Sequence, residues 1–396
     1  MKIFGLNITK NSSPIVEQTQ TTNSGVSSDS VYAFGMQTSL PIIIENHNRD
    51  YVQYLTDEGE QYPIYLEKLY NNSATHQAII NAKTLMANGD GYSVDDSLLS
   101  DEQKLDLSKM LNFIDGKHNI QQFKEKLLKD FEIYGAIAIE LIWSLDFSKI
   151  LKVNKISPKN IRSGKYVNGE VKEYYYSRNF ADRREQETSI AAFDINDKEN
   201  YRQLLYLGHS MVSNEYYFEP SYIAGANWCY LEAQTGLFYK SLMENGFNPS
   251  VIVRFFRKPS SFEERDEIVS GLKKSFGGIK NSGKAIVMFS DGKELAPEVT
   301  PIEVSNIDKQ FTVIADQITT KILTSHRVTT PELFGIAVAG QLGNGDFATQ
   351  VEAFQKFVIQ PSANFIDDLI NKLLKINGLD VKFKTEPFEL QTIKTN

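Results

Sequence analysis

The sequence contains a single cysteine, Cys229, among its 396 residues. One cysteine excludes an intrachain disulfide framework and a zinc site built on several thiolates. It stands between Trp228 and Tyr230, which favours a small buried hydrophobic side chain. The five histidines show no spacing typical of a metal site, and no G-x-S-x-G nucleophile elbow is present. The sequence therefore predicts neither a metal nor a catalytic site.

No stretch approaches the roughly 20 apolar residues that a helix needs to cross a bilayer. The best candidate, Ile133 to Trp143, is short and carries Glu140. The N-terminus also lacks the apolar core of a signal peptide. We therefore expect a protein that does not enter a membrane and stays in the cytoplasm in which it is made.

The sequence also has no excess of Lys and Arg over Asp and Glu. The formal net charge is −8, and the sequence pI is about 5.4. Tight, sequence-reading DNA binding depends mainly on clustered Lys and Arg, so this composition argues against it. With 41% hydrophobic residues, the chain can bury a sizeable core and is expected to be globular.

One glycine-rich stretch, GGIKNSGKAIVMF, resembles a nucleotide-binding phosphate loop. Gly278, Gly283 and Lys284 fit the spacing G-x-x-x-x-G-K, but Ala285 stands where a Ser or Thr would hold Mg²⁺. A phosphate loop also follows a strand and opens a helix. Here a helix predicted over residues 260–276 precedes the glycines and a β-rich run follows them. The context therefore contradicts ATP binding.

The first half of the chain mixes helical and strand patterns without repeats, which indicates an α+β fold. Residues 1–35 are rich in Ser, Thr and Gln, and we expect them to be a flexible arm. Helical patterns cover residues 46–86 and 119–134. A sheet-rich module is predicted over residues 135–215, where Asn168-Gly169 is a strong hairpin signal.

The second half predicts a helix over 222–244, a strand over 250–256, and the helix over 260–276 with Ser/Glu capping pairs at its start. Another helix is predicted from Ser305 to His326, where His326 would interact with the helix dipole. This helix carries a narrow apolar seam. The seam consists of Ile307, Phe311, Ile314, Ile318 and Ile322.

The segment that follows resembles the portal proteins of tailed bacteriophages. In that family a helix ends in a motif like RV-x-x-P-x-L-x-G, and a later proline leads into a closing helix. The first element is matched by Arg327, Val328, Pro331, Leu333 and Gly335. The last is matched by Pro361 and the stripe Ile366, Leu369, Ile370 and Leu373. The resemblance covers at least residues 220–375.

The resemblance implies a ring, commonly of twelve subunits, through which DNA enters and leaves a capsid. It also implies an α+β portal fold with a wing, a two-helix stem, a small β clip, a tunnel loop and a long helix. The expected parts are an arm (1–35), wing (36–259), first stem helix (260–276), clip (277–304), second stem helix (305–327), tunnel loop (328–346), and long helix with C-terminal wing (347–396). A crown should be reduced or absent, because only about twenty residues follow Leu374.

The functional residues that the resemblance implies line the channel or the clip. The tunnel-loop residues are Val338, Gly340, Gln341, Leu342, Gly343, Asn344, Gly345 and Asp346. The clip residues expected to dock terminase and adaptor are Lys280, Asn281, Lys284, Asp291, Lys293 and Glu294. No Lys or Arg lies between Val328 and Gln350, which suits a loop past which double-stranded DNA slides without sequence specificity.

On this resemblance the protein belongs to the virion, at one capsid vertex, after assembly in the bacterial cytoplasm. Its partners would be further copies of itself, double-stranded DNA, the large terminase, the major capsid protein and a head–tail adaptor, and no membrane. It would need no cofactor and would not be an enzyme, since the packaging ATPase is the separate terminase. The alternative is another ring-forming scaffold of a virion or secretion machine.

Overall fold

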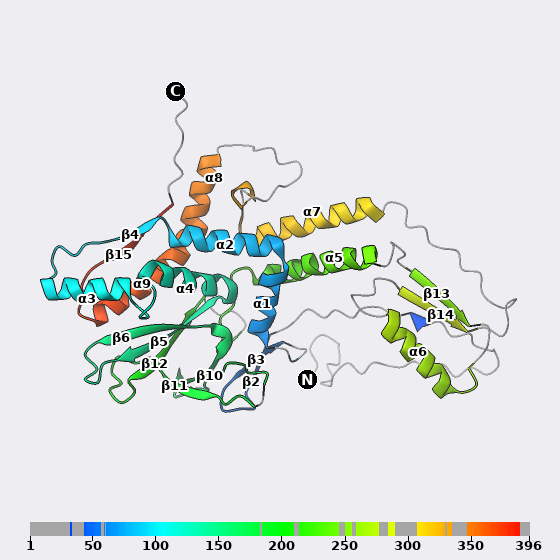
Figure 1. The fold of residues 1–396 in the computed structure, drawn as a ribbon, viewed down its shortest axis with the longest axis horizontal. Coiled ribbons are helices and arrows are strands. Elements are labelled where there is room, and N and C mark those ends of the chain that lie inside the picture. Colours follow the sequence, from blue (N-terminus) through cyan, green and yellow to red (C-terminus); the bar gives the residue numbers. More distant parts are fainter. Residues whose placement is uncertain are drawn as a thin grey trace, which may run out of the picture. The chain divides into compact units, whose positions relative to one another are not determined.

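The computed structural model describes residues 32–33, 43–56, 59, 61–182, 184–209, 214–244, 250–255, 259–276, 284–289, 307–328, 331–334 and 347–388 (Figure 1). The chain divides into two compact units. The small unit combines Met1–Met36 with Asn248–Thr300, and the large unit combines Gln37–Phe247 with Pro301–Asn396.

A six-stranded sheet forms the base of the large unit, with strand order β6-β5-β12-β11-β10-β7. Only β11 and β12 pair in parallel; the other neighbours are antiparallel. The strands are β5 (Ala136–Trp143), β6 (Ile150–Ile156), β7 (Ile161–Ser163), β10 (Glu173–Tyr176), β11 (Thr188–Ala192) and β12 (Arg202–Gly208). The sheet-rich module predicted over residues 135–215 is therefore confirmed.

A tight hairpin extends from this module, as its turn sequence predicts. It joins β8 (Tyr166–Val167) to β9 (Glu170–Val171). Asn168 and Gly169 both have positive φ, 55° and 85°. These values are those of a type I′ turn, which Asn-Gly accommodates with little strain.

Helices lie on one side of the sheet, where α4 packs directly on β5 and β6 (Figure 1). They are α1 (Tyr62–Asn72), α2 (Ala74–Asn88), α3 (Asp101–Asn112), α4 (Ile120–Tyr134), α8 (Phe347–Phe354) and α9 (Gln360–Ile376). α4 begins with a capping box, in which Asn119 accepts from the Gln122 N–H at 2.8 Å. Its Phe123, Leu127 and Leu128 are almost wholly buried, as its apolar stripe predicts. The single cysteine, Cys229, is also buried.

The helical prediction for residues 46–86 is wrong at its start. Residues up to 56 form the hairpin of β2 (Ile43–Asn46) and β3 (Gln53–Thr56), and helix begins only at Tyr62. Tertiary packing decides this segment, because Tyr54 stacks on Tyr217 with ring centroids 4.2 Å apart. The Val52 N–H donates to the Ser163 carbonyl at 2.8 Å, which bonds the hairpin to the sheet. A second two-stranded sheet pairs β4 (Gly91–Val94) with β15 (Phe383–Glu386).

The small unit is a strand–helix–strand arrangement. β13 (Ser250–Phe255) pairs in parallel with β14 (Lys284–Phe289), and β1 (Tyr32–Ala33) adds an antiparallel edge to β14. α6 (Phe262–Phe276) joins the parallel strands and contacts β14. Its start is capped as predicted, with the Glu264 N–H donating to Ser261 Oγ at 3.1 Å. A helix therefore precedes residues 277–283 and a strand follows them, the reverse of a phosphate loop.

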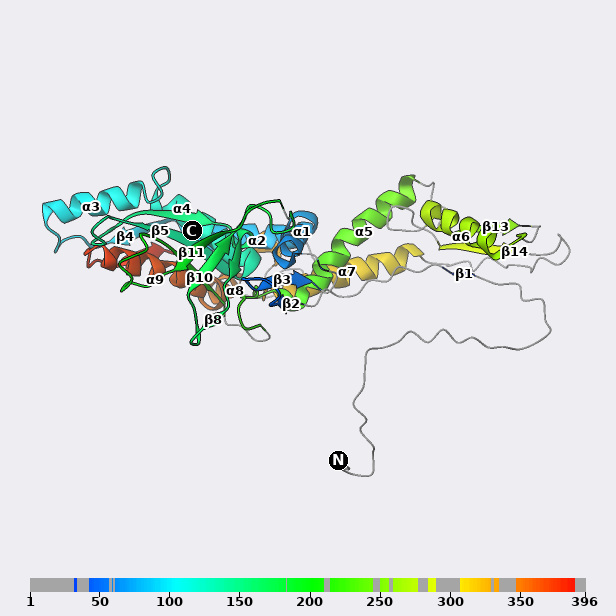
Figure 2. The same ribbon diagram turned by 90° about the horizontal axis from the view of Figure 1, so that it is seen from below.

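Two further helices of the large unit lie side by side (Figures 1 and 2). They are α5 (Ala226–Glu244), which follows a short 3-10 turn at Ile223–Gly225, and α7 (Ile307–Ser325). The predicted helices over 222–244 and 305–326 are thus confirmed. The Asn248–Thr300 part of the small unit lies between them in the sequence.

Candidate functional site

Most residues predicted to line a channel or a clip lie outside the described residues. Those are Val338, Gly340 to Asp346, Lys280, Asn281, Asp291, Lys293 and Glu294, together with Gly335 of the family motif. Among the predicted clip residues, Lys284 is described: it is the first residue of β14 and pairs with Ser250. The roles predicted for these residues stay predictions.

The Arg327-Val328 part of the family motif ends α7. Arg327 has a left-handed backbone, with φ of 58°, and the Val328 N–H donates to the Leu323 carbonyl at 2.9 Å. This bond and the buried Val328 side chain are features of a Schellman-type helix end. Pro331 is also buried, in a short 3-10 turn that contains Leu333. The motif therefore fixes where α7 stops and how the chain leaves it.

Pro361 has no backbone N–H, so it interrupts the regular hydrogen-bond ladder of the helical run that continues from α8 into α9. A π-helical turn, Gln355–Ile359, joins α8 to α9 just before it. Proline and π turns are both common places for a helix to change direction. The stripe predicted on α9 is buried: Ile366, Leu369, Ile370 and Leu373.

Gly225 permits a close crossing where the turn before α5 meets the end of α7. A Cβ placed on Gly225 would lie 2.2 Å from Ser325 Oγ and 2.4 Å from Ser325 Cβ. Nearby, the Tyr222 hydroxyl donates to the Ile133 carbonyl at 2.8 Å, which anchors this turn to α4. Only a residue without a side chain allows the two segments to approach so closely.

Two buried histidines meet at the same junction. His76 Nδ1 of α2 lies 2.9 Å from His326 Nε2, just after α7, and the Tyr222 ring packs on both imidazoles. Burial, with a smaller effect of the Lys83 charge, lowers the pKa of His76 to about 3 and holds that of His326 well below its ordinary range. Both rings are therefore neutral at pH 7. His326 is thus a buried packing residue, in addition to any dipole interaction at the helix end.

This pair predicts that the fold loses stability in acid. The unfolded chain binds protons on both histidines below their ordinary pKa of 6.5, whereas the folded chain does not. The free energy of unfolding should therefore be highest above pH 6.5 and fall as the pH drops toward 3. Protonation of His76 in the unfolded chain should lower it by about 2 kcal/mol at pH 5. Urea unfolding at pH 7 and pH 5 measures this.

The His76→Gln variant should lose less stability between these two pH values than the wild type does. His47→Gln changes an exposed histidine and serves as the matched control. Equal losses in the wild type and His76→Gln would show that other groups cause the acid sensitivity.

A buried ion pair joins three helices beside this junction. Lys83 of α2 bonds to Glu132 of α4, and both side chains are almost wholly buried. Ser362 of α9 donates to the other Glu132 oxygen at 3.1 Å. The bridge therefore fixes α2, α4 and α9 relative to one another.

The outer sides of α5 and α7 expose apolar side chains. The exposed fractions are 44% for Leu231 and Leu237, 39% for Tyr239, 55% for Val313 and 45% for Ile314. Among the charged residues of α5, Glu232 bonds inward to Thr75 Oγ1 at 2.6 Å, whereas Lys240 is exposed. Of the predicted α7 seam, Ile318 and Ile322 are buried within the chain, whereas Ile314 is not. Several large apolar side chains exposed on two adjacent helices often mark a contact with a partner.

Other kinds of site were searched in the part of the chain that the structure describes. No group of three or more His, Cys, Asp or Glu in that part could hold a metal ion. In the same described residues, no helix combines the length and apolar composition needed to cross a membrane.

Comparison with known proteins gives a likeness of fold. No family profile and no curated protein matches the sequence. A chain in the neck of an empty gene transfer agent (GTA) particle is 12% identical with a TM-score of 0.56, over 85% of this chain and 86% of that chain. A chain in the neck of the native GTA particle, computed with C12 symmetry, is 13% identical with a TM-score of 0.51, over 83% and 85%.

A weaker likeness is to the crystal structure of an HK97-family phage portal protein from Corynebacterium diphtheriae. That chain is 10% identical with a TM-score of 0.44, over 81% of this chain and 95% of that chain. Identities this low carry information on the fold alone. The mixed helix-and-strand architecture predicted from the sequence is confirmed, and the α+β fold of this chain is similar to that of chains in the necks of GTA particles.

Proposed function

We propose that this chain is a portal protein of a tailed phage or a related particle. In this role, copies of the chain form a ring at one capsid vertex, contact the major capsid protein, and pass double-stranded DNA during packaging and ejection. The likeness to chains in particle necks supports the proposal, because one of those necks was computed with C6 symmetry and the other with C12 symmetry, and both symmetries describe rings. The ring then belongs to the virion and acts without enzymatic activity of its own.

The observation that carries this proposal is the exposed apolar side of the α5–α7 pair. Leu237 on α5 and Ile314 on α7 are each almost half exposed. A ring of identical subunits covers such a surface with the neighbouring copy, in a head-to-tail contact that repeats until the ring closes. Burial of these side chains then contributes to assembly.

The helix contacts favour a revised assignment of the portal parts. α6, predicted as the first stem helix, packs on β14 within the small unit, whereas the helix beside α7 is α5. We therefore assign α5 and α7 to the stem and the small unit, including α6, to the clip. The clip remains the proposed docking site for terminase and then for the head–tail adaptor, with Lys284 on its strand β14.

The segment after α7 remains the proposed tunnel loop. Residues 329–346 contain two acidic residues, Glu332 and Asp346, and no Lys or Arg. DNA carries about one phosphate charge per 1.7 Å of its length, so a ring of cations on this loop would hold it fast. A loop without cations suits DNA that must slide.

Electron microscopy and sedimentation of the purified chain test the proposal. The wild type should form rings with a central channel. Leu237→Glu combined with Ile314→Glu should shift most of the protein to monomers, because it places two charges per subunit in the apolar contact. Both positions are exposed in the single chain, so its unfolding temperature should change by only a few degrees.

Leu145→Glu is the matched control. Leu145 is 94% exposed and lies in the turn between β5 and β6, at the end of the large unit opposite α5 and α7 (Figures 1 and 2). This variant should form rings as the wild type does. A wild-type chain that stays monomeric at every concentration would contradict the portal assignment. Rings unaffected by the double variant would place the subunit contact elsewhere.

A further inference from the structure

Arg327 occupies the left-handed position of the helix end that stops α7. The Val328 N–H donates to the Leu323 carbonyl at 2.9 Å, and the Arg327 N–H donates to the Thr324 carbonyl at 3.0 Å. These two bonds define a Schellman motif, whose left-handed residue is usually glycine. A residue with a Cβ is crowded by its own backbone at a φ of 58°, so local preferences disfavour arginine here.

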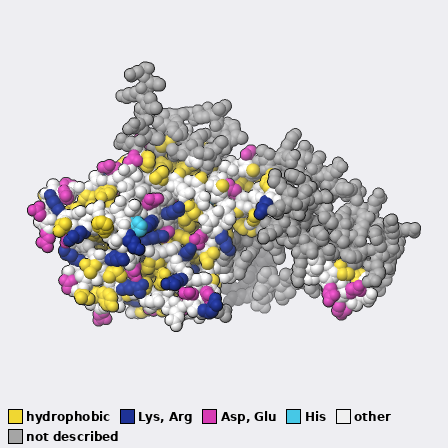
Figure 3. All heavy atoms as spheres, in the orientation of Figure 1, with side chains coloured by type: hydrophobic (Ala, Val, Ile, Leu, Met, Phe, Trp, Pro, Cys, Tyr) yellow, Lys and Arg dark blue, Asp and Glu magenta, His cyan; other side chains and the backbone are white. Residues whose placement is uncertain are grey.

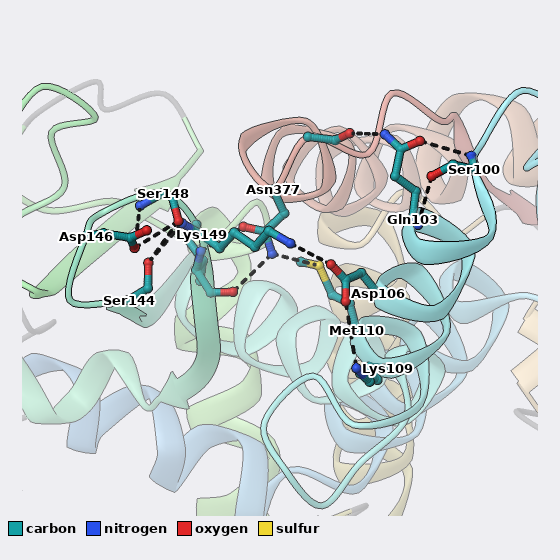
Figure 4. A network of polar contacts seen from close by, with 12 residues as sticks. Ser100, Gln103, Asp106, Lys109, Met110, Ser144, Asp146, Ser148, Lys149 and Asn377 are labelled. Carbon is teal, nitrogen blue, oxygen red and sulfur yellow. Dashed lines mark hydrogen bonds and ion pairs between the residues drawn. The ribbon is translucent and has the colours of Figure 1, made fainter.

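The same chain ends α9 with the same motif and a glycine. The Leu379 N–H donates to the carbonyl five residues before it, and the Gly378 N–H to the carbonyl three residues before it, both at 3.0 Å. The Asn377 side chain ties this end to the first residue of β6 (Figure 4), as His326 ties the end of α7 to α2. The backbone therefore accounts for Gly378, but it does not account for the side chain of Arg327.

An interaction with the helix dipole does not require a cation at this position. Lys375 provides one in the last turn of α9, from an ordinary helical residue. The last turn of α7 contains no basic residue, although a lysine there would interact with the dipole without a left-handed backbone. The dipole thus explains a cation near the end of α7 and leaves its place at Arg327 unexplained.

The exposed Arg327 guanidinium has no anionic partner among the residues that the structure describes. Burial lowers the pKa of the nearby His209, and the charge of Arg327 adds to this effect. Other cations have partners: Lys149 pairs with Asp106 (Figure 4), and Figure 3 shows Lys and Arg side chains lying among Asp and Glu over one face of the large unit. An anion for Arg327 therefore has to come from outside the described part of the chain.

Arg327 stands directly before the segment proposed as the tunnel loop. It is the only Lys or Arg among residues 322–355. The turn that follows it packs on the end of α8, where the rings of Phe334 and Phe354 have centroids 5.5 Å apart. Arg327 therefore lies at the base of the loop segment 335–346.

We propose that Arg327 binds a phosphate of double-stranded DNA at the base of this loop, as one cation per subunit. The proposal rests on the proposed portal function, which brings DNA to this end of α7. A guanidinium pairs with a phosphate through two parallel N–H···O bonds. Ring symmetry places the guanidinium at the same height in every copy. One contact per subunit hinders the sliding of DNA far less than a loop of cations would.

The test titrates a fluorescent DNA duplex with purified rings and follows its anisotropy at low and high salt. Arg327→Gln and Arg327→Gly should each weaken duplex binding about tenfold at low salt and flatten its salt dependence, whereas Arg327→Lys should change binding by less than about twofold. Arg327→Gly should also raise the urea concentration at the unfolding midpoint, because glycine accepts a left-handed backbone without crowding. Arg184→Gln, at an exposed arginine that pairs with Asp182, is the matched control and should leave duplex binding unchanged.

Rings of Arg327→Gln that bind the duplex as tightly as wild-type rings would overturn the proposal, since a role at the helix dipole alone predicts this result. Loss of rings in Arg327→Gln that Arg327→Lys restores would also overturn it, in favour of a carboxylate on the neighbouring copy. Failure of the portal assignment is seen separately, as a wild-type chain that stays monomeric in electron micrographs. Duplex binding by that monomer would support the phosphate contact if Arg327→Gln weakens it; unchanged or absent binding would refute the contact as well.

Discussion

Gly225→Val is expected to separate the start of α5 from the end of α7 and to prevent ring formation. The first added carbon would lie 2.4 Å from Ser325 Cβ, far inside van der Waals contact. A flexible side-chain tip could rotate away, but a Cβ moves only with its backbone, so one helix must shift. Overpacking of this kind costs about 1–3 kcal/mol. Urea unfolding measures the loss of stability, and electron microscopy measures the loss of rings.

Two comparisons separate this clash from a general effect of replacing glycine. Gly236 lies within α5 with open space around its Cβ position, so Gly236→Ala should leave the rings intact and stabilise the helix by up to about 1 kcal/mol. Gly225→Ala alone should also lose stability, because its methyl group would collide with the Ser325 side chain. Combining it with Ser325→Gly should restore part of that stability, because the Ser325 side-chain atoms are then absent. A Gly225→Val protein that is as stable as the wild type and still forms rings would contradict the proposed role of the α5–α7 junction.

Local chemistry made much of the fold predictable. Asn168-Gly169 specifies a type I′ turn through its own backbone preferences, and Asn119 specifies the start of α4 through a contact three residues away. The hairpin at residues 43–56 was missed because its stability comes from Tyr217 and Ser163, more than 100 residues along the chain. Periodicity within a short window carries no information about such partners.

The same limit applies to the candidate site. The Arg327-Val328 motif was visible in the sequence, but its left-handed residue and buried valine were not. His76 and His326 are 250 residues apart, so no spacing rule relates them. The sequence predicts both α5 and α7 as helices, but it predicts α6 as the partner of α7. The contact between α5 and α7 was missed because a helix pattern identifies an apolar face without identifying the surface that covers it.

Lys83→Met is expected to destabilise the large unit by about 3–5 kcal/mol. The substitution keeps a similar volume but leaves the Glu132 carboxylate buried without its counter-charge, with Ser362 as its remaining hydrogen-bond donor. The loss of stability therefore comes mainly from the buried, unpaired charge of Glu132, and less from the lost attraction between Lys83 and Glu132. Urea unfolding at pH 7 of the wild type and the variant measures the difference.

Lys83→Met combined with Glu132→Gln removes both charges and keeps an oxygen that accepts from Ser362. This double variant should recover most of the stability lost in Lys83→Met, because a buried pair is often worth little more than a neutral replacement. It should also be less sensitive to acid than the wild type, because the Lys83 charge contributes to lowering the pKa of both His76 and His326. If the single and double variants were equally unstable, the packing of the Lys83 side chain, and not its charge, would link α2 to α4 and α9.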